Sequence, residues 1–157
     1  MTTERSYSMK LLLPVLALAA IPAMQAHAQT TPIGVYKTNG CGCCLFWMEY
    51  LEENGFTPTS EDMFMGSLVQ LKLDNDVPQR MVSCHTALVD GYVIEGHVPA
   101  ADIRRLLEER PDAVGLAVPG MPYGSPGMGP EKNREAYDVF LILRDGSTEI
   151  YSSYPEG

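Results

Sequence analysis

The chain has 157 residues, of which 20 are acidic and 11 basic, and its formal net charge at neutral pH is −9. An acidic surface repels nucleic acid and anionic lipid, which excludes nucleic acid as an expected partner. No apolar run is long enough to span a bilayer comfortably, so we expect no membrane insertion.

The first 28 residues are predicted to form a signal peptide that is removed. Arg5 and Lys10 precede the apolar run 11–23, which is short and interrupted by prolines, and Ala-His-Ala at 26–28 has the pattern of a signal-peptidase site. Residues 29–157 are enough chain for one domain with its own core. We therefore expect a periplasmic protein, in a compartment where paired thiols are normally oxidised.

The first elements of the mature chain are predicted from hydrophobic spacing and turn residues. The apolar run 33–36 indicates a short strand, and the turn residues 37–40 follow it. A helix is predicted over 44–54, where Asn-Gly provides a C-cap signal. Residues 56–63 can form a second strand and residues 67–75 a second short helix.

A hairpin and a third helix are predicted next. Residues 86–89 and 92–94 flank Asp90-Gly91, a strong hairpin signal, and Pro99 begins a helix. The resulting order, β-α-β-α-β-β-α, predicts an α/β fold of the thioredoxin-like type. We assign this domain to residues 29–111.

Residues 112–157 are predicted to form a C-terminal extension. Residues 114–130 are rich in Gly and Pro and predict a long loop without obvious secondary structure, a kind of segment that is usually functional or disordered. Two near-repeats of Pro-Gly-Met place Met121 and Met128 in this loop. After it, residues 137–151 predict a closing β-hairpin around Asp-Gly.

The grouping of the four cysteines indicates a functional site rather than disulfide stapling. Three form the motif Cys41-Gly42-Cys43-Cys44, and Cys84 directly precedes a histidine. Adjacent cysteines cannot easily pair with each other. The motif lies where the first strand ends and the first helix begins, and the N–H groups and positive dipole of a helix start stabilise thiolates. Cys41 and Cys44 also have Cys-x-x-Cys spacing, so both are candidate catalytic residues.

The mature chain concentrates soft ligands in predicted loops and element ends. Thiolate and thioether select Cu(I), and imidazole accepts both copper oxidation states. The candidate metal ligands are Cys41, Cys43, Cys44, Cys84, His85, His97, Met121 and Met128. Closely spaced thiols can bridge metals, which predicts bound copper with more than one ion. Zinc is an alternative, because four thiolates or three with one imidazole suit it, but thioethers and an oxidising compartment favour copper.

Each candidate ligand also has a plainer interpretation. The clustered cysteines could form one disulfide with a thiol left over, and Cys84 could be a small buried residue or a structural bridge. His85 and His97 could be hydrogen-bonded supports. Met121 and Met128 could fill gaps in the packing.

Four motifs in order resemble one family. They are Cys-x-Cys-Cys after the first strand, Ser-Cys-His-Thr-Ala at 83–87, Asp-Gly-Tyr-Val-Ile-Glu-Gly-His-Val-Pro at 90–99, and the doubled Pro-Gly-Met segment at 119–128. Together they resemble the CopG-type proteins of Gram-negative copper-resistance clusters. The resemblance implies a thioredoxin-like domain whose C-terminal extension helps bind metal. It also implies a cysteine-bridged copper cluster beside the Cys-x-Cys-Cys motif and interconversion of Cu(I) and Cu(II) around copper efflux.

Three functions remain open at this point. The first is a copper-binding, oxidoreductase-like resistance protein, with a redox step that is either copper-centred or uses a reversible Cys41–Cys44 disulfide that releases metal when it forms. The second is a metal-free thiol–disulfide oxidoreductase, against which the extra Cys43 and the Met-bearing extension argue. The third is a passive copper chaperone. Copper ions and components of copper efflux are the expected partners, and a monomer is the expected state.

Overall fold

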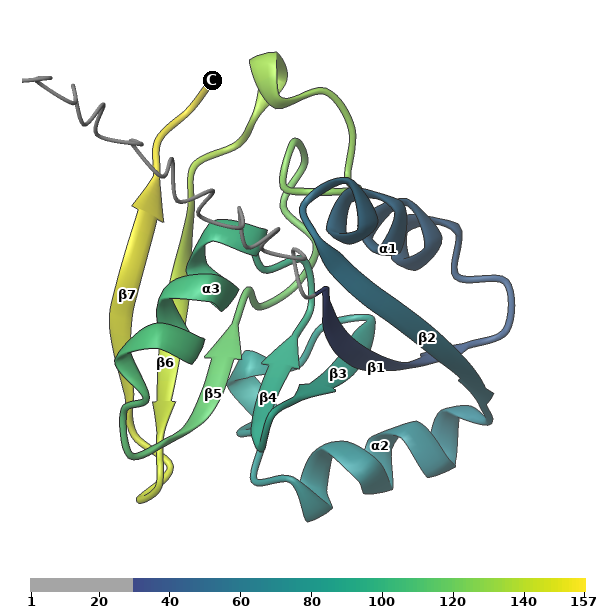
Figure 1. The fold of residues 1–157 in the computed structure, drawn as a ribbon, viewed down its shortest axis with the longest axis vertical. Helices are drawn as coiled ribbons and strands as arrows, with labels where there is room; N and C mark the ends of the chain where they lie inside the picture. The colour runs from purple at the N-terminus through teal and green to yellow at the C-terminus, as the bar shows by residue number, and fades with distance from the viewer. Residues whose placement is uncertain (1–29) are drawn as a thin grey trace, which may run out of the picture.

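A computed structural model describes residues 30–157, and the predicted signal peptide lies outside the described residues. The elements in this part of the chain are β1 (Thr31–Thr38), α1 (Gly42–Glu53), β2 (Phe56–Met63), α2 (Met65–Asp74), β3 (His85–Val89), β4 (Tyr92–Glu95), α3 (Ala100–Glu109), β5 (Ala113–Ala117), β6 (Tyr137–Leu143) and β7 (Thr148–Tyr154) (Figure 1). Two short 3-10 helices, η1 (Gln79–Met81) and η2 (Glu131–Asn133), lie in the connections. The mixed α/β class is confirmed.

The strands form one seven-stranded sheet in the order β2-β1-β3-β4-β5-β6-β7. β1 is parallel to β2, and β4 is parallel to β5 across the connection that contains α3. The other neighbouring strands are antiparallel. The predicted hairpins at 86–94 and 137–151 are both present, as β3–β4 and β6–β7.

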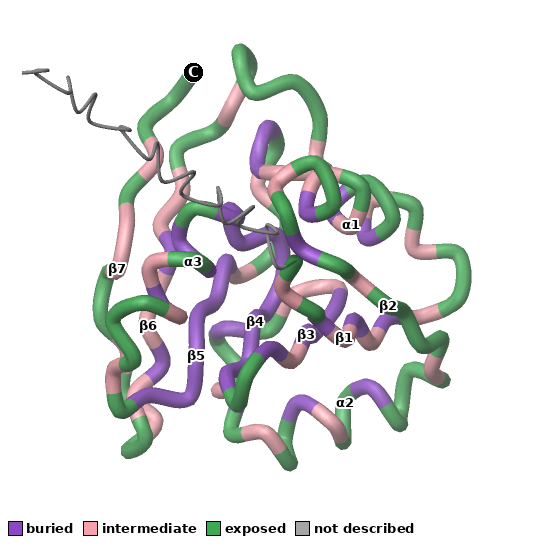
Figure 2. The backbone as a smooth tube through the Cα atoms, in the orientation of Figure 1, coloured by how far each residue is buried: buried purple, intermediate pink, exposed green. Residues whose placement is uncertain are grey.

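The prediction of one long loop over 114–130 is wrong in its first part, because β5 occupies Ala113–Ala117 near the middle of the sheet. All residues of β5 are buried, as Figure 2 shows. A strand covered on both faces has no apolar–polar alternation to identify it. Gly115 also favoured the loop prediction, because glycine is common in loops. In the structure glycine is needed in the strand itself, because a Cβ at this position would collide with the backbone of Val93 on β4.

Helices cover both faces of the sheet. One core contains Trp47 and Leu51 of α1 together with Ile103 and Leu106 of α3, all fully buried. On the other face α2 packs against β1 and β3, and the side chain of Lys72 reaches the strand residues Thr86 and Glu95. The indole Nε1 of Trp47 donates a 3.0 Å hydrogen bond to the carbonyl oxygen of Val98, which lies just before α3. This bond fixes α1 against the start of α3.

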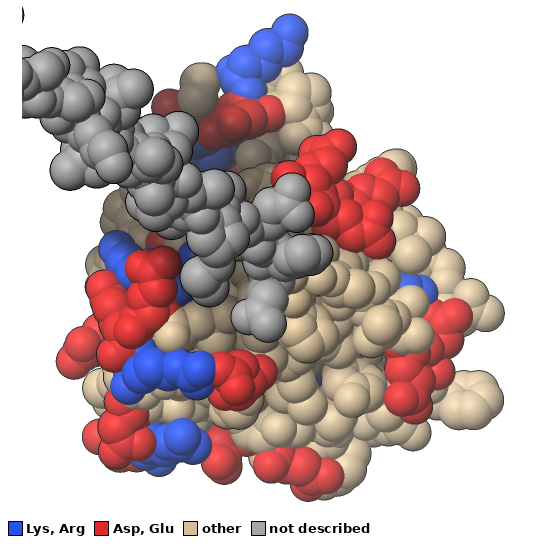
Figure 3. Space-filling model, in the orientation of Figure 1, with Lys and Arg blue, Asp and Glu red and all other residues tan. Residues whose placement is uncertain are grey.

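Acidic groups outnumber basic ones in the chain. Figure 3 shows Asp and Glu in several separate groups, with Lys and Arg beside some of them. Among the helices of residues 30–157, none is long and apolar enough to cross a membrane.

Candidate metal centre

The cysteine motif lies at the junction of β1 and α1. The chain turns after Thr38 with Gly40 at φ +78°, a left-handed conformation that glycine adopts without strain. Cys41 is the N-cap residue of α1, and Cys43 and Cys44 lie in the first turn, which contains no acidic side chain. The motif therefore occupies the positive end of the α1 dipole, where thiolates are stabilised.

Sheet pairing brings the fourth cysteine to this junction. β1 runs antiparallel to β3 and Lys37 pairs with His85, so the start of β3 lies beside the end of β1. Cys84 directly precedes β3, and its Sγ lies 3.7 Å from the Sγ of Cys44. Two segments that are 40 positions apart thus meet at one point.

The four sulfur atoms form one cluster. Cys41 and Cys44 are joined by a disulfide, with Cα atoms 5.4 Å apart, and Cys43 and Cys84 are free thiols. The Sγ of Cys43 lies 3.6 Å from the Sγ of Cys41. All four Sγ atoms lie within 4.8 Å of one another, which is close enough for a common metal site.

Two buried histidines flank Cys84. Its Sγ lies 3.3 Å from Nδ1 of His85 and 3.2 Å from Nε2 of His97. Nδ1 of His97 lies 2.7 Å from the carbonyl oxygen of Pro126. Because a carbonyl only accepts, this contact assigns the proton to Nδ1 and leaves Nε2 as an acceptor. The ring of His85 packs against Trp47 with centroids 4.4 Å apart, and its Nε2 has no hydrogen-bond partner within residues 30–157.

Burial shifts the pKa values of these groups toward their neutral forms. Desolvation, helped by the nearby Cys43, raises the pKa of the Cys84 thiol to about 12. Burial also lowers the pKa of His97, and it lowers the pKa of His85 well below its usual range, with smaller contributions from His97 and Lys72. Both imidazoles are therefore neutral at neutral pH, as metal ligation requires.

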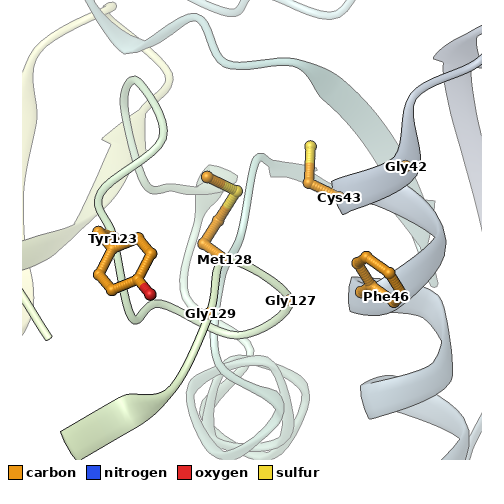
Figure 4. Close-up of a pocket in the computed structure, with 7 residues that line it drawn as sticks. All are labelled: Gly42, Cys43, Phe46, Tyr123, Gly127, Met128 and Gly129. Carbon is orange, nitrogen blue, oxygen red and sulfur yellow. The ribbon is translucent and has the colours of Figure 1, made fainter. Parts of the chain in front are cut away.

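The Gly/Pro-rich loop of the extension packs directly on the start of α1. A Cβ at Gly127 would lie 2.6 Å from the backbone nitrogen of Trp47 and 3.0 Å from the carbonyl oxygen of Cys43, so only glycine allows this approach. A cavity of about 550 Å³ lies between the loop and the helix. It is lined by Gly42, Cys43, Phe46, Tyr123, Gly127, Met128 and Gly129 (Figure 4).

The two methionines of the extension have different positions. Met128 lines the cavity together with Cys43, and Figure 4 shows its thioether between Tyr123 and Cys43. Met121 is 54% exposed and does not line that cavity. The structure therefore brings one of the two predicted thioethers to the border of the cysteine cluster.

The donors at this junction fit a soft metal ion. Six of the predicted ligands form two groups that share Cys84: one contains Cys41, Cys43, Cys44 and Cys84, and the other contains Cys84, His85 and His97. Nδ1 is the nitrogen of His85 that faces Cys84, and the buried Nε2 of that ring has no hydrogen-bond partner within residues 30–157. Thiolates and neutral imidazoles suit copper or zinc, whereas hard cations prefer oxygen.

Comparison with known proteins decides the family. Residues 81–128 match a family described as protein of unknown function, DUF411, and no curated protein matches the chain. Two solved structures of the copper resistance protein CopG, Form 1 and Form 2, are 45% and 44% identical to it, each with a TM-score of 0.74. The matches cover 80% of this chain and 98% and 99% of those chains. This chain belongs to the CopG copper resistance protein family.

A buried ion pair supports the Cys84 segment of this CopG-family chain. Nζ of Lys72 lies 2.6 Å from Oε1 of Glu95, and these side chains are 5% and 0% exposed. The Glu95 carboxylate also accepts hydrogen bonds from the backbone N–H of Ser83, at 2.6 Å, and from the Thr86 hydroxyl, at 2.7 Å. Burial raises the pKa of Glu95, and Lys72 and these hydrogen bonds oppose that rise. The carboxylate thus holds the residues on both sides of Cys84 and His85, Ser83 by its backbone and Thr86 by its side chain.

Several of these supporting residues were missed in the sequence. The single tryptophan, Trp47, follows the cysteine motif by less than one helical turn, and that spacing was a usable signal. Lys72 lies four residues after the buried Leu68 on α2, and Glu95 ends an apolar strand, so both were charged residues at core positions. The role of the Pro126 carbonyl oxygen could not be predicted, because every residue has a backbone carbonyl and the residue type does not show which one makes a contact.

Proposed function

We propose that this chain is a periplasmic copper-binding protein of copper resistance, which holds copper with Cys41, Cys43, Cys44 and Cys84. The observation that carries the proposal is the four-sulfur cluster, which shares Cys84 with a buried pair of neutral imidazoles. His85 and His97 are the nitrogen ligands in this proposal, and Met128 is an outer thioether ligand. The close sulfur spacing supports more than one copper ion per chain.

A thioredoxin-like scaffold is part of the proposal. The strand order β2-β1-β3-β4, with β3 antiparallel to its neighbours and the cysteine motif at the start of α1, supports it. In this arrangement residues 29–111 form the scaffold, and residues 112–157 contribute Met128 and the carbonyl that orients His97. We propose that the protein acts as a monomer and exchanges copper with components of copper efflux.

The chemistry assigned to the site combines metal binding with a redox step. Bound copper supplies one-electron exchange between Cu(I) and Cu(II). The chain supplies thiolates stabilised by the α1 N-terminus, and it holds them in a partly buried site with two buried imidazoles beside it. Cys41 and Cys44 can be ligands only as thiols or thiolates, so the disulfide between them and metal binding by them exclude each other.

The test is copper retention by residues 29–157, with the wild type compared with a Cys41→Ser/Cys44→Ser double variant. Both proteins are reduced, loaded with copper and freed of excess, and copper content is measured together with the visible absorption spectrum. We expect the wild type to keep more than one copper per chain with a thiolate charge-transfer band. We expect the variant to lose both, because two of four thiolates are missing. A Met121→Leu variant is the control, since this thioether lies outside the cavity.

A metal-free thiol–disulfide oxidoreductase is the second candidate, and the Cys41–Cys44 disulfide at a helix N-terminus favours it. Wild-type protein that keeps no copper but has a reducible Cys41–Cys44 disulfide would support this candidate against ours. A passive chaperone would keep its copper but release it on oxidation. Repeated oxidation and reduction without loss of metal would separate the proposed role from the chaperone.

The two methionines provide a narrower prediction. Met128→Leu should weaken copper retention several-fold, because the thioether beside Cys43 is lost while an apolar side chain of similar size fills the cavity. Met121→Leu should leave retention unchanged, because this side chain is exposed away from the cavity. Competition with a chromophoric Cu(I) chelator measures both affinities. Equal affinities for the two variants would remove Met128 from the proposed ligands.

A further inference from the structure

Each sulfur of the disulfide has a free thiol beside it. Cys84 Sγ lies 3.7 Å from Cys44 Sγ, and Cys43 Sγ lies 3.6 Å from Cys41 Sγ. Thiol–disulfide exchange proceeds by attack of one sulfur on another, and it is fast only when the attacking sulfur is held close. The sulfur atoms are thus close enough for exchange within one chain as well as for metal binding. Because all four lie within 4.8 Å of one another, the Cys84 side chain must first turn to bring its sulfur into line with the Cys41–Cys44 bond.

Cys84 also has a proton acceptor in place. Nε2 of His97 lies 3.2 Å from its Sγ, and the contact of Nδ1 with the carbonyl oxygen of Pro126 leaves Nε2 free to accept. A partly buried thiol needs such a partner, because it must lose its proton to act as a nucleophile. The Cys84–His97 pair is bound to the extension through Pro126, so the extension takes part in orienting it.

We propose that the disulfide migrates from Cys41–Cys44 to Cys44–Cys84. Sγ of Cys84 attacks Sγ of Cys44, the Cys44–Cys84 bond forms, and the Cys41–Cys44 bond breaks with its electron pair leaving on Cys41. The proton of the Cys84 thiol passes to Nε2 of His97 and then to Cys41 or solvent. One disulfide and two free thiols exist before and after, so no external oxidant or reductant is needed. The exchange uses the cysteines of the proposed copper site but requires no copper.

The position of Cys41 favours it as the leaving sulfur. Cys41 is the N-cap residue of α1, where the helix dipole stabilises a departing thiolate, and a stabilised thiolate leaves faster. Attack by Cys43 on Cys41 would instead keep Cys41 bonded. Attack by Cys43 on Cys44 would create a strained bond between adjacent residues.

The exchange changes which cysteines are free thiols. Cys44 is fully buried, so the new bond to Cys84 lies on the inner side of the cluster. Cys41 and Cys43 then become the free pair, and Cys43 already lines the cavity beside Met128. A chain that carries one disulfide thus still offers a Cys-x-Cys pair to a soft metal ion or to the thiol of a partner.

The test measures whether Cys41 is a free thiol. In a chain with one disulfide, Cys41 is bonded to Cys44 before the exchange and is free after Cys84 has attacked Cys44. Metal-free wild-type protein is oxidised to one disulfide per chain and incubated with a chelator. It is then quenched with acid, labelled with N-ethylmaleimide in denaturant, and mapped by peptide mass spectrometry. We expect a population with labelled Cys41 and Cys43 and a linked Cys44–Cys84 peptide. Absence of both Cys41 label and Cys44–Cys84 peptide would overturn the proposal.

Matched variants identify the attacking sulfur. Cys84→Ser should reduce labelling of Cys41 at least tenfold, whereas Cys43→Ser should still show labelled Cys41 and the Cys44–Cys84 peptide. Labelling of Cys41 in Cys84→Ser at the wild-type level would contradict our assignment. The near-ultraviolet circular dichroism of Trp47 checks folding, and if Cys84→Ser fails to fold, the linked peptide of the wild type decides.

His97 is tested by the rate rather than by the final distribution. His97→Gln should slow the approach to the final ratio of the two disulfides roughly a hundredfold, because proton transfer is lost. An unchanged rate would remove His97 from the step. Copper is absent from every sample, so failure of the exchange leaves the copper-retention result standing, and failure of copper retention leaves the exchange result standing.

Discussion

Lys72→Met is expected to lower the free energy of unfolding by about 3–5 kcal/mol at neutral pH, because it leaves the fully buried carboxylate of Glu95 without a cation. Urea denaturation of the copper-free protein, followed by fluorescence of Trp47, measures the loss. Burial already raises the pKa of Glu95, and removal of Lys72 raises it further. A raised pKa in the folded state means that the folded chain binds the proton more tightly, so the deficit should shrink as the pH falls.

The double variant Lys72→Met/Glu95→Gln is the matched control. It removes the buried charge together with its partner and keeps a side chain that can accept a hydrogen bond from Ser83, so most of the lost stability should return. Copper retention should remain weakened in both variants, because the Cys84 segment is then anchored less firmly. A loss below about 1 kcal/mol for Lys72→Met would show that the pair does not stabilise this region.

Gly127→Ala is expected to destabilise the protein and to weaken the candidate metal site at the same time. Gly127 has φ +78°, and a Cβ would lie 2.6 Å from the backbone nitrogen of Trp47. The left-handed backbone costs about 1–2 kcal/mol for alanine, and the clash with rigid backbone adds about 1–3 kcal/mol. The loop must move away from α1, which also moves the Pro126 carbonyl from His97. Copper retention and thermal unfolding of the same samples measure both effects.

Gly120→Ala separates strain from packing. Gly120 has φ +69°, similar to Gly127, but a Cβ there meets nothing within 4 Å. Gly120→Ala should therefore lower the free energy of unfolding only by the cost of a left-handed backbone for alanine, about 1–2 kcal/mol. Copper retention should be unchanged. If both variants lose the same stability and the same copper, close packing of the loop on α1 has no role in the site.

The local features of this protein were predictable from its sequence. The Asp90-Gly91 turn forms as expected, with φ values of +47° and +86°, because only a few residue types adopt such a turn without strain. The position of Cys41, Cys43 and Cys44 at a helix start was also predictable, because helical spacing begins directly after them. Cys84, His85 and His97 were named as candidate ligands by their residue types alone.

Which of these residues meet depends on contacts between distant segments of the chain. Cys84 reaches Cys44 because Lys37 of β1 pairs with His85 of β3, and a strand register depends on all the contacts of a sheet. β5 could not be predicted either, because a strand that is buried on both faces lacks the apolar–polar alternation by which a strand is identified. The donor types of the candidate site and the start of its helix could therefore be predicted from residue types and spacing. Three features could not be predicted, because their contacts join segments far apart in the chain and depend on the tertiary structure. They are the sulfur cluster, the position of Met128 rather than Met121 beside that cluster, and the buried ion pair that supports the Cys84 segment.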